Sequence, residues 1–232
     1  MGKWINRIGV ELEIEVDRDA DGRIPTIDGF NATSDGSIRS CDGGDAVEYV
    51  TEPFEYCNAG VPELEAGVRR LYEEHNARAN ATMGLHMHVS FNRRFYYYAL
   101  ASMRFYQHFM DHVRASDLWD RNARLRERAE GVQYAQPIQS HTELDYSLKR
   151  TPGGSRRYRH FIYRPNMETI EFRLFPAMDS ARDVLAAVDI VTAAINSYLA
   201  AKKYELDEEL VVEVQTTDVR DRRSIEEVVQ YV

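Results

Sequence analysis

Carboxylate and imidazole side chains recur at every second position in two segments of this chain. Glu11, Glu13 and Glu15 alternate with leucine, isoleucine and valine in GVELEIEVD, and His86 and His88 alternate with apolar residues in GLHMHVSF. Successive side chains of a strand point to opposite faces, so each polar set shares one face. Neighbouring carboxylates at about 6.6 Å repel by roughly 2.5 kcal/mol at an effective dielectric of about 20. Such a face is therefore either solvated or neutralised by positive charge.

Two further segments repeat this alternation. Glu48 lies in VEYVTEP, and Glu171 and Arg173 share one side of TIEFRLF. If the four segments are neighbours in one sheet, their polar faces form a continuous patch of carboxylates and imidazoles. Mg²⁺ prefers carboxylate oxygen, and histidine joins where Mn²⁺ or Zn²⁺ is accepted. The solvent face of an antiparallel sheet gives the same pattern in a single strand, so the metal interpretation depends on the four segments coming together.

The elements that must position these side chains alternate irregularly between strands and helices. Polar, poorly periodic residues 120–160 are expected to form long loops. Period-two segments predict strands, and apolar periodicity predicts helices over 61–79, 95–116 and 181–203. A strand at 209–214 and a helix from Ser224 are expected in the tail. This order favours an α+β fold with a mainly antiparallel sheet and packed helices, in one domain of residues 1–232.

Composition excludes several classes of protein. The chain has 232 residues and a net charge of −9, which argues against a broad nucleic-acid surface. Its two cysteines cannot form a disulfide framework or a four-cysteine zinc site. The N-terminus lacks a signal-peptide core, and no apolar run approaches about 18 residues. These features predict a cytoplasmic protein without a membrane segment.

The polar motifs, taken together, carry a resemblance to a known family. GVELE, SDGSI, EYVTEP, GLHMHVS and TIEFRLF occur in this order between residues 9 and about 176. This set resembles the successive motifs of the amidoligases, which are carboxylate–amine ligases related to glutamine synthetase and glutamate–cysteine ligase. The resemblance implies a glutamine synthetase-like catalytic domain whose concave polar sheet face binds Mg·ATP, with Mn²⁺ as an alternative ion.

The resemblance also implies roles for individual residues. His88 would lie near the nucleotide phosphates, Arg173 would face the transferred phosphoryl group, and Asp35 of SDGSI would hold or deprotonate the amine. Glu15 has no family role and is expected to be a solvated charge. Glu52 departs from the small or apolar residue usual before this proline, which leaves the substrate open. The residues that match the metal ligands of the family are Glu11, Glu13, Glu48, His86 and Glu171.

A basic segment between Tyr146 and Met167 contrasts with the acidic chain. It contains no acidic residue, and TPGGSRR within it is expected to form a hinged lid over phosphates. Arg157 and Arg164 are candidates for nucleotide binding, and Arg159 is a candidate catalytic residue at the phosphates. A solvated basic loop or an RNA contact is the alternative.

The resemblance implies an ATP-dependent ligase that joins a carboxylate to an amine through an acyl phosphate. The substrates would be small molecules or peptides, and the oligomeric state is left open. Three alternatives stay open: a phosphotransferase resembling the guanidino kinases, a metal-dependent hydrolase using His86 and His88, and a non-catalytic binding protein.

Residues 17–28, DRDADGRIPTID, match part of a calcium loop. Asp17, Asp19 and Asp21 precede Gly22, as in an EF-hand. The segment follows a strand, however, and Asp28 stands where a bidentate glutamate is usual. A polar hairpin turn is the preferred interpretation, with a weak calcium site as the alternative.

Overall fold

A computed structural model describes residues 4–55, 60–93, 95–133, 135–140, 144, 158–164 and 166–202. The strands are β1 (Ile5–Val16), β2 (Phe30–Thr33), β3 (Asp45–Thr51), β4 (Phe54–Glu55), β5 (Leu85–Phe91), β6 (Phe161–Arg164) and β7 (Thr169–Phe172). The helices are α1 (Gly60–Glu74), α2 (Phe95–Leu100), α3 (Met103–Arg114), α4 (Asp117–Arg121), α5 (Ala123–Glu130) and α7 (Ala181–Lys202). The expected tail strand at 209–214 and the helix from Ser224 lie outside the described residues.

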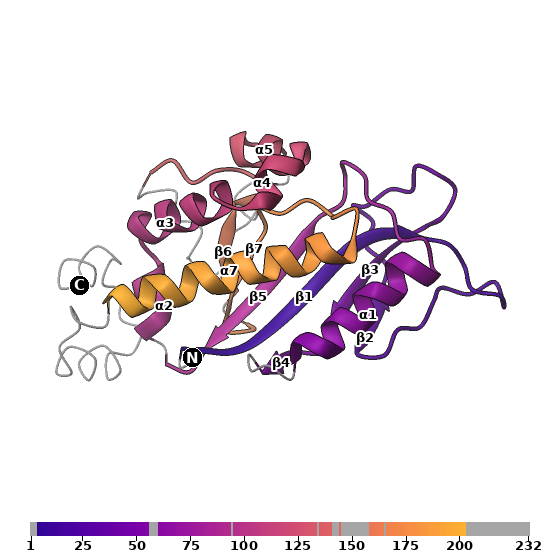
Figure 1. Ribbon diagram of the computed structural model, residues 1–232, viewed down its shortest axis with the longest axis horizontal. Coiled ribbons are helices and arrows are strands. Elements are labelled where there is room, and N and C mark those ends of the chain that lie inside the picture. The colour runs from indigo at the N-terminus through magenta and orange to yellow at the C-terminus, as the bar shows by residue number, and fades with distance from the viewer. Residues whose placement is uncertain are drawn as a thin grey trace.

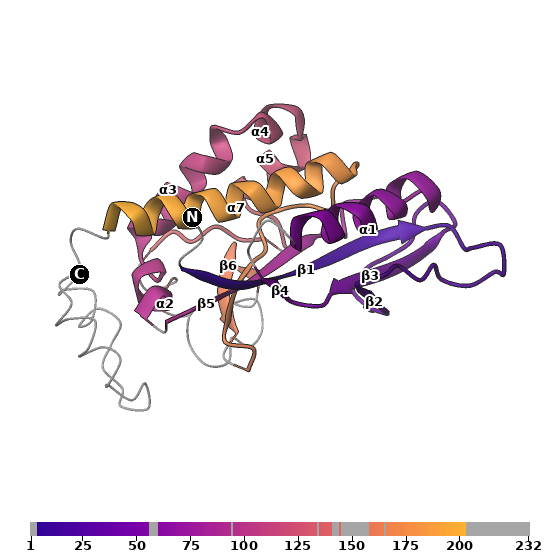
Figure 2. The same cartoon turned by 60° about the horizontal axis from the view of Figure 1, so that its bottom comes forward.

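The described strands form one antiparallel sheet. Its order is β2–β3–β1–β5–β7–β6, with β4 paired to the beginning of β1. The long strand β1 therefore lies between β3 and β5, and α1 and α7 cover one side of it (Figures 1 and 2). This arrangement confirms the α+β class with a mainly antiparallel sheet.

Alternation along β1 separates a packed face from a polar face. Val10, Leu12, Ile14 and Val16 are completely or almost completely buried and belong to the main core, which also takes residues from α1, α3 and α7. Helix α7 packs against both α1 and α3. The glutamates of β1 are on the opposite face of the strand and do not belong to this core.

Helix α7 is apolar and almost entirely as expected from the sequence. By length and composition alone it could cross a membrane, whereas the sequence predicted no membrane segment. Over half of its most apolar window is buried inside the fold, as in the core helix of a soluble protein. Cytoplasmic location stays a prediction.

The helical layer differs from the sequence expectation in three places. The helix expected over 95–116 is divided into α2 and α3, because Ser102 has an extended backbone and its side chain caps Phe105 N. The short helices α4 and α5 occupy part of 120–160, where loops were expected. Helix α1 ends at Glu74 rather than 79, since Asn76 takes a left-handed conformation with φ of 49°.

Residues 17–28 connect β1 to the edge strand β2 and pass over the intervening β3, so they are not a simple hairpin. Asp19 Oδ1 accepts the backbone N–H groups of Asp21 and Arg23, which is an Asx-type turn. Asp17 is bonded to Asn76 and Arg78. The acidic side chains serve local turns and ion pairs, and they do not converge as calcium ligands.

Candidate functional site

The strand register brings the four polar segments onto one face of the sheet. Glu11 of β1 lies opposite His86 of β5, and Glu13 lies opposite Glu48 of β3. Residues directly opposite each other in an antiparallel pair project to the same side. Glu171 of β7 is opposite His88, so the polar face continues across four strands. The coincidence on which the metal interpretation depended is therefore present.

The first convergent group joins β1, β5 and β7. Glu11, His86 and Glu171 each offer a ligand atom, and these atoms lie within 4.8 Å of one another. His86 Nδ1 is 3.3 Å from Glu11 Oε2 and 3.8 Å from Glu171 Oε1. One imidazole nitrogen and two carboxylates form a donor set that accepts Mg²⁺, Mn²⁺ or Zn²⁺.

The second convergent group joins β1, β3 and the loop between β2 and β3. Glu13, Asp35 and Glu48 also bring ligand oxygens within 4.8 Å of one another. Thr33 donates a 2.9 Å hydrogen bond to Glu48 Oε2, and Asp35 Oδ1 accepts the backbone N–H of Ser37. Three carboxylates are a hard-cation donor set. The grouping gives Asp35 a place beside the predicted metal ligands.

The carboxyl groups of the second group repel one another. Burial raises the pKa of Glu13 and of Glu48, and for Glu48 the charges of Glu11, Glu13 and Asp35 raise the pKa further. The partial compensation comes from His86 and Gly84 N–H at Glu13 and from the Thr33 hydroxyl at Glu48. A cation bound among the three oxygens would remove this repulsion, so the residues present fit a divalent ion.

In the first group, positively charged neighbours lower the pKa of the carboxyl groups by more than burial raises it. Burial alone would raise the pKa of Glu11, but His86 and His88 lower it well below its usual range. Burial likewise opposes ionisation of Glu171, whose pKa is lowered by Arg173 and then by His86 and His88. Both carboxyl groups are therefore ionised at neutral pH, which is the form that binds cations.

Two arginines flank the first group. Arg164 Nε and Arg173 Nη1 each donate to a different oxygen of Glu171. The Arg173 guanidinium also lies over the ring of Tyr158 at 5.8 Å. Arg173 Nε is buried and has no hydrogen-bond partner among the described residues. The pair supplies the cationic side of the polar face.

His88 faces the same region. Its Nδ1 is 3.0 Å from Thr169 Oγ1, and its Nε2 is 3.0 Å from Glu11 Oε1. The Glu11 carboxylate is therefore the nearest polar neighbour of this buried nitrogen. His88 therefore links Glu11 of β1 to Thr169 of β7 across the polar face.

The position of Glu13 depends on residues that the sequence did not single out. The backbone N–H of Gly84 donates to Glu13 Oε2 at 2.5 Å. Arg128 of α5 is buried, and it donates to the carbonyl groups of Met83 and Phe175 at 2.7 and 2.8 Å. Arg128 thereby fixes the entry to β5 and contributes positive charge near Glu13. Nothing in the sequence distinguishes Arg128 from the other arginines of α4 and α5, so its burial could not be predicted.

Glu15 was expected to be a solvated charge, and this expectation is wrong. The residue is buried, and its carboxylate accepts the backbone N–H groups of Cys41 and Gly44, each at 2.8 Å. Arg78 adds an ion pair at 3.0 Å. These contacts hold the pKa of Glu15 at about 2 despite burial. Glu15 anchors the end of the loop that carries Asp35.

The arginines predicted to contact phosphate lie in different places. Arg164 lies beside Glu171, as described above. Arg159 Nη1 donates to the carbonyl of Pro137 at 2.7 Å, a contact outside both convergent groups. Arg157 and the TPGGSRR segment lie outside the described residues.

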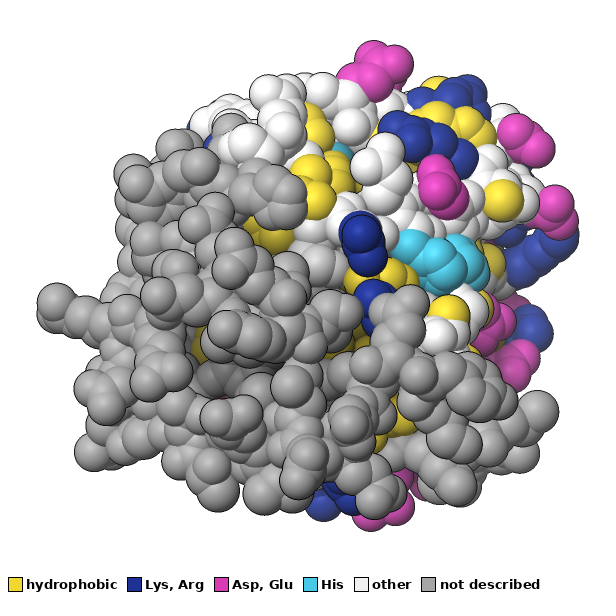
Figure 3. Space-filling view, turned by 90° about the vertical axis from the view of Figure 1, so that its left-hand side faces the viewer, with side chains coloured by type: hydrophobic (Ala, Val, Ile, Leu, Met, Phe, Trp, Pro, Cys, Tyr) yellow, Lys and Arg dark blue, Asp and Glu magenta, His cyan; other side chains and the backbone are white. Residues whose placement is uncertain are grey.

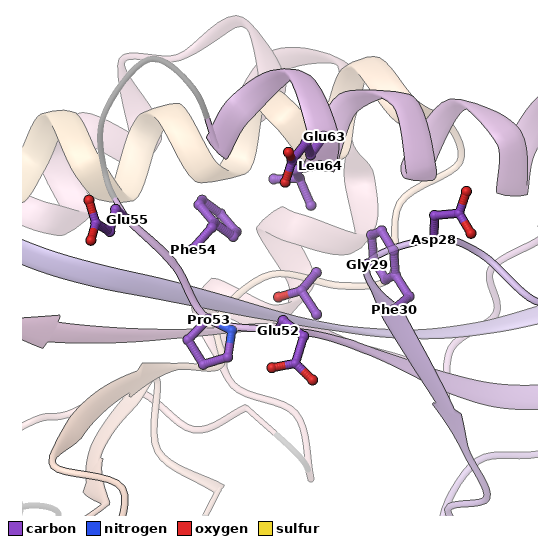
Figure 4. Close-up of a pocket in the computed structure, with 10 residues that line it drawn as sticks. Asp28, Gly29, Phe30, Glu52, Pro53, Phe54, Glu55, Glu63 and Leu64 are labelled. Atoms are coloured by element: carbon purple, nitrogen blue, oxygen red, sulfur yellow. The ribbon is translucent and has the colours of Figure 1, made fainter.

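A hollow of about 340 Å³ lies elsewhere, between α1 and the β3–β4 connection (Figure 4). Phe54 and Leu64 give it an apolar wall, and Glu52 lies at its edge. None of the predicted site residues lines it. Glu52, which departs from the family pattern, therefore belongs to a different region from the convergent groups.

Comparison of the sequence with known proteins gives no significant match to a protein-family model or to a curated protein.

Proposed function

We propose that this protein is an ATP- and Mg²⁺-dependent ligase that forms an amide from a carboxylate and an amine, in a glutamine synthetase-like catalytic domain. The observation that carries the proposal is the pair of convergent groups on one sheet face, with Arg164 and Arg173 beside them. Glu11 belongs to the first group and Glu13 to the second, and the two are neighbours on the same face of β1. The motif resemblance supplies the reaction type.

Different residues would have different roles in phosphoryl transfer. Mg²⁺ ions bound to the two groups would neutralise phosphate oxygens, and Mn²⁺ could replace them. Arg173 would face the transferred phosphoryl group, and His88, beside Glu11, would lie near the nucleotide phosphates. Arg164 and Arg173 hold Glu171 ionised and in position. Arg157 and Arg159 remain proposed as phosphate-side residues on the basis of the basic segment in the sequence.

The reaction has two balanced steps. A carboxylate oxygen of the substrate attacks the γ-phosphorus of ATP, the bond to the bridging oxygen of ADP breaks, and an acyl phosphate forms. The amine then attacks the acyl carbon, inorganic phosphate leaves, and one proton is lost from nitrogen to give the amide. Glu13 and Glu48 would be the metal ligands of the second group, and half-buried Asp35 beside them would hold the substrate ammonium or accept this proton.

The first test is calorimetric titration with a non-hydrolysable ATP analogue, with and without Mg²⁺. We expect Mg²⁺-dependent binding in the parent protein and its loss in Glu13→Gln, which keeps side-chain size but removes a charge. Glu73→Gln, an exposed residue of α1, is the matched control and should bind as the parent does. Unchanged affinity in Glu13→Gln would refute the role of Glu13.

Product analysis then separates the reaction classes. A ligase releases free phosphate and an amide only when ATP, carboxylate and amine are all present. Retention of the phosphoryl group on an acceptor nitrogen would instead identify a guanidino-kinase-like phosphotransferase. Hydrolysis without nucleotide would identify a metal-dependent hydrolase, and nucleotide binding without turnover would indicate a binding protein.

A further inference from the structure

A second histidine cluster lies in the helical layer, away from the convergent carboxylate groups. His108 and His112 are four residues apart on α3, so their side chains occupy neighbouring positions on one face of the helix. Their ring centroids are 4.4 Å apart. Both are half-buried, and histidine side chains reach the surface at the end of the molecule where α7 finishes (Figure 3).

Both rings turn the same nitrogen toward one point. His108 Nε2 lies 2.8 Å and His112 Nε2 lies 3.1 Å from the hydroxyl of Ser197, which belongs to the adjoining helix α7. Ser197 is exposed, and its hydroxyl also contacts the carbonyl of Ala193 at 2.8 Å. The hydroxyl therefore has a backbone partner other than the rings and can turn from them without losing all its contacts.

The backbone of α3 fixes the protonation pattern of one ring. His112 Nδ1 lies 3.0 Å from the carbonyl oxygen of His108, which can only accept a hydrogen bond. Nδ1 must therefore carry the proton, and in the neutral ring Nε2 has a free lone pair directed toward Ser197. Metal-ligating histidines commonly donate their other ring N–H to a backbone carbonyl in this way.

We infer that His108 and His112 form a binding site for a divalent transition-metal ion of the imidazole-preferring group, such as Zn²⁺, Ni²⁺ or Cu²⁺. The two Nε2 atoms would be the protein ligands, with water and the displaced Ser197 hydroxyl available to complete the coordination. Mg²⁺ is excluded by its preference for oxygen ligands. The site differs in place and donor chemistry from the carboxylate groups and does not depend on the proposed ligase activity.

The test measures bound Zn²⁺ per chain by equilibrium dialysis of the full-length protein. We expect His108→Asn/His112→Asn to bind one Zn²⁺ fewer than the parent. His75→Asn removes a histidine that follows α1 and is the matched control, with the parental stoichiometry. Equal stoichiometry in the double variant and the parent would overturn the inference.

A measurement on the unmodified sequence removes any dependence on how the variants fold. Zinc added to protein labelled with ¹⁵N at histidine should shift the Nε2 resonances of His108 and His112 while His112 Nδ1 stays protonated. Unchanged resonances of both residues at saturating zinc would also overturn the site.

Discussion

The three alternating glutamates of β1 are tolerated because each has a different set of compensating groups. Glu11 faces His86 and His88, Glu13 receives the Gly84 N–H near the charge of Arg128, and Glu15 is paired with Arg78. Only the first two belong to convergent groups. The same sequence pattern therefore encodes two functions, a candidate cation site and a structural anchor, and the spacing alone does not distinguish them.

At Glu15 this distinction gives a stability prediction. Glu15→Gln keeps the shape of the side chain but weakens the charge-assisted bonds to the Cys41 and Gly44 N–H groups and to Arg78. We expect a loss of about 2 kcal/mol in the free energy of unfolding, measured from the urea midpoint. Glu73→Gln, which breaks only an exposed pair, should cost less than about 0.5 kcal/mol. Equal midpoints for the two variants would contradict the anchor role.

At the level of elements, strand register makes the site, and the sequence predicts only its components. Alternation correctly identified the polar faces of β1, β3, β5 and β7, and the order of motifs implied that these faces meet. It could not reveal that the 41–44 backbone turns its N–H groups onto Glu15 or that Arg128 enters from α5. Those contacts depend on the path of a loop and on where a helix packs. Neither is encoded in a periodic pattern of residues that the sequence shows.

The helices show the same limit. The apolar pattern runs through 95–116 without interruption, but Ser102 caps α3 and also contacts Tyr198 of α7 at 3.0 Å. The N-cap at Ser102 thus marks the boundary between α2 and α3, and the same side chain contacts α7. Conversely, α7 was predicted almost to the residue, because its long apolar pattern and the Ser180 cap agree with its tertiary position.

The entry to β5 gives a prediction at the scale of elements. A Cβ on Gly84 would lie 2.8 Å from His86 Nε2, 3.2 Å from Arg128 Nη1 and 3.3 Å from Glu13 Oε2, so Gly84→Ala must displace His86 and crowd Arg128 and Glu13. We expect Gly84→Ala to lose Mg²⁺-dependent nucleotide binding by calorimetry. Gly9→Ala is the matched control on β1, since its nearest contact would be an ordinary 3.8 Å to His88. Equal affinities would show that the close approach at Gly84 is not needed for binding.

Across the whole molecule, the two faces of the sheet have separate tasks. The helical side carries the main core and leaves the opposite face to carboxylates, imidazoles and arginines. Arg128 and His160 connect the two, because the Arg128 carbonyl accepts from His160 while its guanidinium holds the entry to β5. Disturbing this buried connection should therefore affect the stability of the whole fold.

His160 makes that connection sensitive to acid. Its Nε2 lies 3.0 Å from the Arg128 carbonyl and must donate, so its Nδ1 accepts from the Tyr106 hydroxyl at 2.8 Å. The bond from the Tyr106 hydroxyl needs the neutral ring, because a protonated Nδ1 has no lone pair to accept it. Burial, and then the charges of Arg128 and Arg159, lower the pKa of His160 from 6.5 to about 4. Between these two values the unfolded chain binds a proton that the native protein does not.

The free energy of unfolding should therefore fall as the pH falls from about 6.5 to 4, by about 3 kcal/mol from this residue. His160→Gln retains a donor for the Arg128 carbonyl and an acceptor for Tyr106 but cannot titrate. Its stability should be lower at pH 7, and the difference from the parent should shrink as the solution is acidified. Urea unfolding of both proteins at pH 7, 6, 5 and 4 measures this convergence. Parallel curves at constant separation would mean that His160 takes up its proton equally in the native and unfolded states.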